Sequence, residues 1–286
     1  MATLPDVGVI DLMMGTRAPA SGQYAFLAPQ LRDAGSKEMA FPAGYMFRDV
    51  PVAEELQGAD LLLPQMDRFG VDKALIGVSE ENELAQAALA HHPDRFLASF
   101  QVDPNQGMDG VRALVHAHQT WGVRAATAFP AGYLPQVPID DRRMYPLYAK
   151  CVELGIPMIV NAGVPGPRVP MACQDVALLD QVCYDFPELT LIMRHGAEPW
   201  EDLAVKLMLK WPGLHYMTSG FAPRYYPTAI VDYANTRGAD KVLYAGYFPM
   251  GLSLERIFAE LPQVPFTDEV WPKFLRHNAE RVLGLA

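Results

Sequence analysis

The chain has 286 residues, of which 50% are hydrophobic and 20% are charged, so it can bury a large core in one α/β domain or in two small ones. Its formal net charge of −10 argues against a nucleic-acid-binding surface and means that an acidic substrate would need local arginines. No apolar run approaches the roughly 20 residues that span a bilayer, and the N-terminus lacks a signal core, so we expect a cytoplasmic protein with no membrane partner.

Eight short apolar runs, taken in chain order, predict strands. They are nearly continuous rather than alternating, as in a parallel sheet with both faces covered. The runs lie at residues 7–11, 73–78, 95–102, 123–129, 157–163, 189–196, 214–220 and 241–248. Amphipathic patterns typical of helices lie between most of them. Eight alternating units favour a closed (β/α)8 TIM barrel, formed by residues 1–286 as one domain, over an open doubly wound sheet.

Two segments depart from this alternation. Residues 17–60 separate the first two strands by more than a normal crossover and are rich in Pro, Gly, Met and aromatic residues. Such long loops are usually functional or disordered, and the apolar content disfavours disorder, so we expect an inserted cap over the barrel mouth. Residues 267–286 predict an extra C-terminal helix packed against the outside of the barrel.

The C-terminal ends of the strands carry the chemistry in barrels of this kind. His195 is the only histidine of seven at such an end, where an imidazole can act as a general acid or base. The alternative is a neutral histidine held in the barrel wall. We expect His195 to be catalytic and to be oriented by Asp11 or Glu198. Candidates for substrate binding are Met13, Met14, Arg124, Phe129, Tyr133, Asn161, Arg168, Arg194, Arg224 and Tyr247.

Two of these arginines, Arg168 and Arg224, have an equally plausible alternative as members of surface salt bridges. No glycine-rich phosphate cradle follows any predicted strand, so we expect no dinucleotide cofactor. The methionines and aromatic residues near the predicted mouth favour a substrate with a sizeable apolar skeleton.

Four stretches are similar, in order and spacing, to the amidohydrolase superfamily. They resemble the amidohydrolase-2 branch, which holds aminocarboxymuconate-semialdehyde decarboxylase-like and pyrone-dicarboxylate lactonase-like enzymes. The stretches are HPDRF (92–96), YPLYAKCVELGIPMIV (145–160), DFPELTLIMRHGAEPW (185–200) and NAERVLGL (278–285). The resemblance implies a TIM barrel and assigns the position of His195 to acid–base chemistry or substrate binding.

The sequence departs from this branch at the family's metal ligands. Met13 and Gly15 stand where the family has a His-x-His pair, and Asn161 stands where strand five normally ends in His. The run AGYFPM, which contains Tyr247, replaces the run that carries the strand-eight aspartate. Met, Gly, Asn and Tyr cannot supply the three or four ligands that a catalytic zinc or manganese requires. We therefore expect no catalytic metal and no other cofactor.

Two classes of function fit these features. The first is a metal-independent hydrolase acting on a mostly apolar, cyclic or carboxylate-bearing small molecule, through a lactone, an ester or a β-dicarbonyl C–C bond. His195 would move protons, Arg124 or Arg168 would clamp a carboxylate, and Tyr247 and Asn161 would bind the oxyanion. A decarboxylase is the alternative enzyme. The second class is an inactive barrel that binds a ligand. The resemblance also implies a homo-oligomer.

Overall fold

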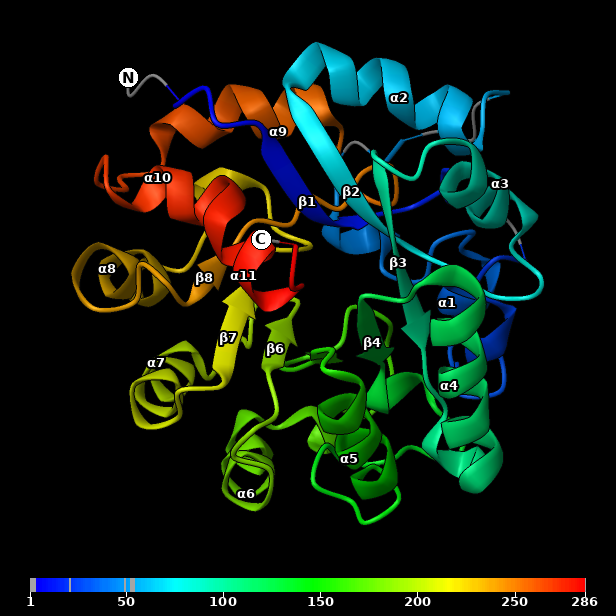
Figure 1. Cartoon of the computed structure of the whole chain (residues 1–286). Coiled ribbons are helices and arrows are strands. Elements are labelled where there is room, and N and C mark those ends of the chain that lie inside the picture. The colour runs from blue at the N-terminus through cyan, green and yellow to red at the C-terminus, as the bar shows by residue number, and fades with distance from the viewer. Residues whose placement is uncertain (1–3, 21, 49, 52–54, 286) are drawn as a thin grey trace.

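Eight parallel strands form one sheet in the order of the sequence, each hydrogen-bonded to the next along the chain (Figure 1). The computed structural model describes residues 4–20, 22–48, 50–51 and 55–285. The strands are β1 (Val9–Met14), β2 (Val71–Gly77), β3 (Phe96–Gln101), β4 (Ala125–Ala128), β5 (Met158–Asn161), β6 (Leu191–Arg194), β7 (Leu214–Met217) and β8 (Val242–Leu243). The predicted TIM barrel and its eight strands are confirmed.

The barrel is closed between its first and last strands by backbone hydrogen bonds. The Leu12 N–H donates to the Tyr244 carbonyl (3.3 Å), and the Tyr247 N–H donates to the Met13 carbonyl (3.2 Å). Since β8 itself has only two residues, the chain immediately after it completes the wall.

Helices surround the barrel (Figure 1). The amphipathic patterns that predict helices cover residues 81–94, 107–122, 142–155, 175–187, 200–212 and 252–262. They therefore leave out two of the helices, α2 and α8. Within the described ranges, no helix combines the length and apolarity needed to cross a bilayer. The helices of the outer layer are α2 (Gly58–Phe69), α3 (Glu83–His91), α4 (Met108–Trp121), α5 (Tyr145–Leu154), α6 (Leu179–Asp185), α7 (Glu201–Lys210), α8 (Thr228–Thr236) and α9 (Leu254–Glu260).

The C-terminal helical segment consists of α10 (Val270–Pro272), a π-helical turn (Lys273–His277) and α11 (Asn278–Val282). The sequence predicted a helix that packs on the outside of the barrel. The segment also contributes side chains to the barrel interior. Ala279, Val282 and Leu283 join the cluster of apolar side chains that fills the barrel interior. The segment therefore closes the N-terminal end of the barrel and leaves the other end for a site.

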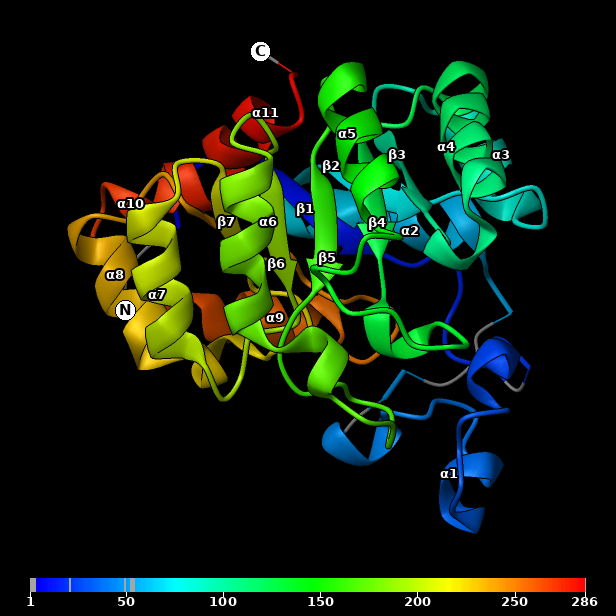
Figure 2. The same ribbon diagram turned by 90° about the horizontal axis from the view of Figure 1, so that it is seen from below.

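The segment between β1 and α2, residues 15–57, lies at the opposite end of the barrel from α11 (Figure 2). It contains the short helix α1 (Ala34–Glu38), whose first turn is capped by the Asp33 carboxylate. The Gln30 side chain donates to the Gly132 carbonyl, and the Tyr45 hydroxyl donates to the Gly166 carbonyl. The segment thus rests on the loops that follow β4 and β5. Residues 21, 49 and 52–54 of the predicted cap lie outside the described residues.

Candidate active site

The inward-facing side chains change from apolar to polar near the C-terminal end of the barrel. On β5, Ile159 belongs to the apolar interior and Asn161 follows it two residues later on the same face. On β6, Ile192 and Arg194 repeat this arrangement. Asn161 and Arg194 are register partners, so an amide and a guanidinium lie side by side above the apolar interior.

Arg194 is a partly buried cation. Its Nε–H donates to Oδ1 of Asn161, and no carboxylate of the described residues forms an ion pair with it. Burial lowers the pKa of Arg194 from 12.5 to about 10, while the nearby phenols of Tyr247 and Tyr133 act in the opposite direction. The guanidinium therefore remains charged at neutral pH without an acidic partner.

His195 follows Arg194 directly and is held by Ser219, which lies two residues after the end of β7. Its Nδ1 lies 3.2 Å from Oγ of Ser219 and 3.4 Å from the Ser219 carbonyl oxygen. Its backbone N–H donates to the same Oγ at 3.3 Å. Burial and then the Arg194 charge lower the pKa of His195 to about 3. The imidazole is therefore neutral at pH 7, and its Nε2 forms no hydrogen bond to any described residue.

Backbone strain is concentrated at this end of the barrel. The non-glycine residues with positive φ in the described part of the chain are His195 (69°), Ala197 (59°) and Tyr247 (100°). They follow β6 and β8, and the rings of His195 and Tyr247 meet edge to face with centroids 5.3 Å apart. Such conformations cost free energy and tend to occur where a side chain must be held for function.

Aromatic side chains of the segment 15–57 cover Tyr247. The rings of Phe47 and Tyr247 stack with centroids 5.7 Å apart, and Phe41 packs on both. On the other side of the mouth, Gly77 at the end of β2 and Gln101 at the end of β3 are exposed. The β8 side of the mouth is therefore covered by aromatic rings, whereas the ends of β2 and β3 are exposed.

Asp11 points away from this site. Its Oδ1 accepts the backbone N–H groups of Met13 and Gly246, each at 2.9 Å, and so joins β1 to the chain after β8. Its Oδ2 lies against Gly246 together with the Tyr244 hydroxyl and Ile257 of α9. Burial raises the pKa of Asp11 to about 7. Asp11 closes the barrel wall and does not hydrogen-bond to His195.

Glu198 does not orient His195 either. Its side chain is partly buried, and burial together with the charge of Glu201 raises its pKa. Its backbone carbonyl accepts the Val164 N–H at 2.8 Å, but its carboxylate forms no hydrogen bond with His195.

The two methionines of β1 lie on opposite faces of the strand, since Met13 packs against the barrel interior and Met14 against the outer core.

Three predicted arginines lie outside the site. Arg124 is exposed and precedes β4, so it lies at the N-terminal end of the barrel and the predicted clamp is corrected. It lines a cavity of about 410 Å³ there with His118 and Gly284. Arg168 forms an ion pair with Asp33 at 2.9 Å, and Arg224 forms one with a side chain of α9. Both arginines are therefore members of surface salt bridges, the alternative that the sequence left open.

The aromatic candidates after β4 remain at the mouth. Tyr133 is buried, and its hydroxyl donates to the Val102 carbonyl at 2.8 Å and accepts the Phe129 N–H. Phe129 is partly buried, and its ring meets that of Phe26 edge to face. The structure thus brings together Met13, Phe129, Tyr133, Asn161, Arg194, His195 and Tyr247.

Sequence reasoning missed Ser219 as a partner of His195 and Tyr24 as part of the aromatic cover, where it packs on Phe41. A serine after a strand carries no distinctive signal.

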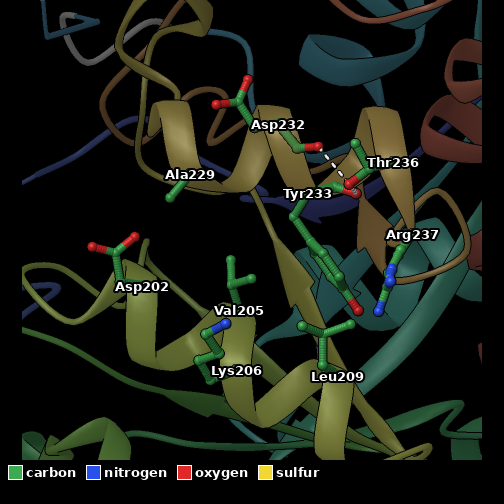
Figure 3. Close-up of a pocket in the computed structure, with 9 residues that line it drawn as sticks. All are labelled: Asp202, Val205, Lys206, Leu209, Ala229, Asp232, Tyr233, Thr236 and Arg237. Carbon is green, nitrogen blue, oxygen red and sulfur yellow. Dashed lines mark hydrogen bonds between the residues drawn. The ribbon is translucent and has the colours of Figure 1, made fainter.

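The surface groove of about 490 Å³ between α7 and α8 contains none of the site residues (Figure 3). It is lined by Asp202, Val205, Lys206, Leu209, Ala229, Asp232, Tyr233, Thr236 and Arg237.

Replacing Ser219 with Ala is expected to loosen His195. The variant keeps the Ser219 carbonyl but leaves the buried N–H of His195 without its acceptor, which costs ~1–3 kcal/mol of unfolding free energy. The ¹⁵N NMR signals of the imidazole should move toward the Nδ1–H tautomer, because the remaining carbonyl can only accept a hydrogen bond from Nδ1. Ser253→Ala is the matched control, because it removes an N-cap of α9 and should lower stability by ~1 kcal/mol. Unchanged imidazole signals in Ser219→Ala would contradict this role.

The donor set does not suit a divalent metal. Nowhere in the described ranges do three His, Cys, Asp or Glu side chains come together as a metal-binding group. The strand ends supply the amide of Asn161, the phenol of Tyr247 and the thioether of Met13 instead, and a guanidinium occupies the same layer. Zinc and manganese sites are built from imidazole, thiolate and carboxylate groups.

Solved structures with this architecture come from several bacteria. An uncharacterised TIM-barrel protein of Bordetella bronchiseptica superposes with a TM-score of 0.72 at 22% identity, covering 96% of this chain and 98% of that one. A 5-carboxyvanillate decarboxylase of Novosphingobium aromaticivorans, complexed with manganese and 4-hydroxy-3-methoxy-5-nitrobenzoic acid, gives 0.70 at 15% identity, with 96% of each chain covered. A 2,6-dihydroxybenzoate decarboxylase of Rhizobium gives 0.66 at 15% identity and covers 97% and 99%.

No curated protein matches the sequence. The family model described as amidohydrolase matches residues 27–285, which span seven of the eight strands, the outer helices and the C-terminal segment. The resemblance carried by the motifs around residues 92–96, 145–160, 185–200 and 278–285 is thereby confirmed. The chain belongs to the amidohydrolase family, as a divergent member whose described residues form no metal-binding group of His, Cys, Asp and Glu side chains.

Proposed function

We propose that this protein is a hydrolase that needs no divalent metal, acts on an apolar cyclic small molecule and uses His195 to transfer protons. The observation that carries the proposal is the free Nε2 of a neutral His195 beside the charged Arg194. With Nδ1–H directed at the Ser219 carbonyl, Nε2 is a proton acceptor. A water held at Nε2 is then the nucleophile.

The reaction proposed for a lactone or an ester has two proton transfers. Nε2 takes a proton from water as the hydroxide oxygen bonds to the carbonyl carbon, and the carbonyl oxygen becomes an oxyanion. Arg194 and the Tyr247 hydroxyl are the donors for this oxyanion, since burial raises the pKa of Tyr247 to about 12 and keeps the phenol protonated. The C–O bond then breaks, and His195 returns the proton to the leaving oxygen.

A decarboxylase is the second candidate, because two of the structural neighbours bear that name. Loss of CO₂ from a ring leaves an electron pair on carbon, which must receive a proton. A neutral His195 has that proton to give only in the Nε2–H tautomer, which the Ser219 hydroxyl permits by donating to Nδ1. The low pKa of His195 keeps the imidazole deprotonated at neutral pH, so that it is available to accept a proton, as hydrolysis requires.

A substrate screen with metal analysis tests the proposal. Protein purified without added metal is assayed against aryl esters, lactones, β-diketones and 2,6-dihydroxybenzoate, before and after dialysis against a chelator. We expect ester or lactone hydrolysis that changes by less than about twofold on chelation, because none of the groups proposed to act is a metal ligand. Activity that disappears with the chelator and returns with zinc or manganese would overturn the metal-free proposal. Release of CO₂ alone would favour the decarboxylase.

A further inference from the structure

Arg194 is partly buried and has no acidic partner among the described residues. Arg276, for comparison, forms ion pairs with Asp72 at 2.6 Å and Glu280 at 2.7 Å. Arg194 is partly buried as well, yet its hydrogen bond to Asn161 is to a neutral amide. Burying a charge without a counter-charge is unfavourable, so proteins normally pair such a group or use it for a ligand.

The hydrogen bond to Asn161 leaves the binding edge of Arg194 free. A guanidinium has five N–H donors in a rigid plane, and here Nε uses one of them. The described residues accept no hydrogen bond from Nη1 or Nη2. Because these two nitrogens present parallel N–H groups, the free edge matches the two oxygens of a carboxylate.

We propose that Arg194 binds the carboxylate of a ring-bearing ligand and supplies, as part of the chain, the positive charge at the centre of the site. This inference rests on the proposed function and names its substrate class. The aromatic rings of Tyr247 and Phe129, which follow β8 and β4 at the same end of the barrel, favour a flat apolar body for the ligand. Asn161 is a positioning residue, since it fixes the plane of the guanidinium through Nε.

A carboxylate at Arg194 would also change His195. The Arg194 charge is one of the causes that hold the imidazole in its neutral form, after burial. A bound anion offsets this charge next to the ring. Ligand binding therefore makes His195 easier to protonate and readies it to receive a proton.

Benzoate and its neutral analogue benzamide are suitable probes. We measure the dissociation constant of each by calorimetry for the full chain and for Arg194→Met, and use Arg224→Met as the matched control because that arginine already pairs with Glu260. We expect wild-type protein and Arg224→Met to prefer benzoate to benzamide by at least about tenfold, and Arg194→Met to lose this preference. Arg194→Lys, which keeps the charge without the planar edge, should show an intermediate preference.

Several results would overturn the inference. These are no benzoate binding by wild-type protein, equal affinity for the two probes, and a benzoate preference that persists in Arg194→Met. Wild-type protein alone provides a further test if Arg194→Met does not fold. In that test benzoate, but not benzamide, must shift the NMR titration of His195 to higher pH, and an unchanged titration would contradict the inference.

The test separates this inference from the proposed function, because none of its readouts needs turnover. Arg194-dependent benzoate binding in a protein without hydrolase activity would support the carboxylate site and reject the enzyme. Hydrolysis of neutral esters, together with benzoate binding that is unchanged in Arg194→Met, would support the enzyme and reject the carboxylate site at Arg194.

Discussion

Asp11→Asn is expected to gain stability over the wild type as the pH rises from about 4 to about 7, by ~4 kcal/mol in total. Burial raises the pKa of Asp11 from 3.8 to about 7, against the two backbone N–H groups that favour its charged form. Between these pH values the folded protein keeps a proton that the unfolded chain has released. The stabilising contribution of this proton is complete below pH 3.8 and is lost as the pH rises toward 7.

Denaturant unfolding of both proteins at a series of pH values checks this result. The difference in unfolding free energy should grow by ~1.4 kcal/mol per pH unit and level off above pH 7. His195 and His215 have buried rings whose pKa values are lowered to about 3, so they give the opposite slope in both proteins and cancel in the difference. Asp268→Asn, at an exposed acid, should run parallel to wild type. A parallel curve for Asp11→Asn would show that its carboxyl is not perturbed.

The strands could be predicted because each is a short apolar run buried on both faces, and this pattern depends little on tertiary context. The residues at which the strands begin and end, and two of the helices, were harder to predict from the sequence. The run 241–248 contains only the two-residue β8, since the chain after Leu243 turns to contact Asp11 and ends in the strained Tyr247. Helix α2 contains Pro64, and α8 follows a proline and includes Thr228, Ile230 and Val231, so both lack a clear helical signal.

The sequence predicted the site residues whose position depends only on their place at the C-terminal end of a strand. Asn161, Arg194, His195 and Tyr247 meet because each follows the same end of a neighbouring or facing strand. The direction of a side chain was not accessible, because a strand that is apolar on both faces shows no alternation. Asp11 therefore could not be assigned to the outer face of β1 from the sequence. Arg124 was misplaced because it stands at the start of the predicted run 123–129, directly before β4, and so lies at the N-terminal end of the strand rather than at the mouth.

The site also shows why the neutral imidazole and the cation belong together. Arg194 discourages protonation of His195, and burial has the same effect, so the resting site holds one positive charge rather than two. That charge is available to a ligand oxyanion, while Nε2 remains free to accept a proton. The positive φ of His195 has an energetic cost, which the contacts to Ser219 offset.

His195→Asn is expected to lower kcat by ~10²- to 10⁴-fold on any substrate found, because it removes the group that accepts and returns the proton. Asparagine is the suitable replacement, since it tolerates the positive φ of 69° better than most residues and offers an amide to Ser219. The unfolding midpoint should therefore stay close to that of wild type. His215→Asn, at a buried histidine on the N-terminal side of β7, is the control and should keep kcat within about threefold.

The pH dependence of the wild-type rate tests the same residue without a substitution. A base is active when deprotonated, so activity is lost as the pH falls through the pKa of His195. For kcat/KM, which reports the free enzyme, this acid limb should lie near pH 3 rather than near 6.5. For kcat with an anionic substrate the limb should lie at higher pH, because the bound carboxylate offsets the Arg194 charge. A kcat/KM limb near 6.5 would contradict the lowered pKa of His195. Full activity in His195→Asn would remove His195 from the reaction and leave Arg194 as a binding group alone.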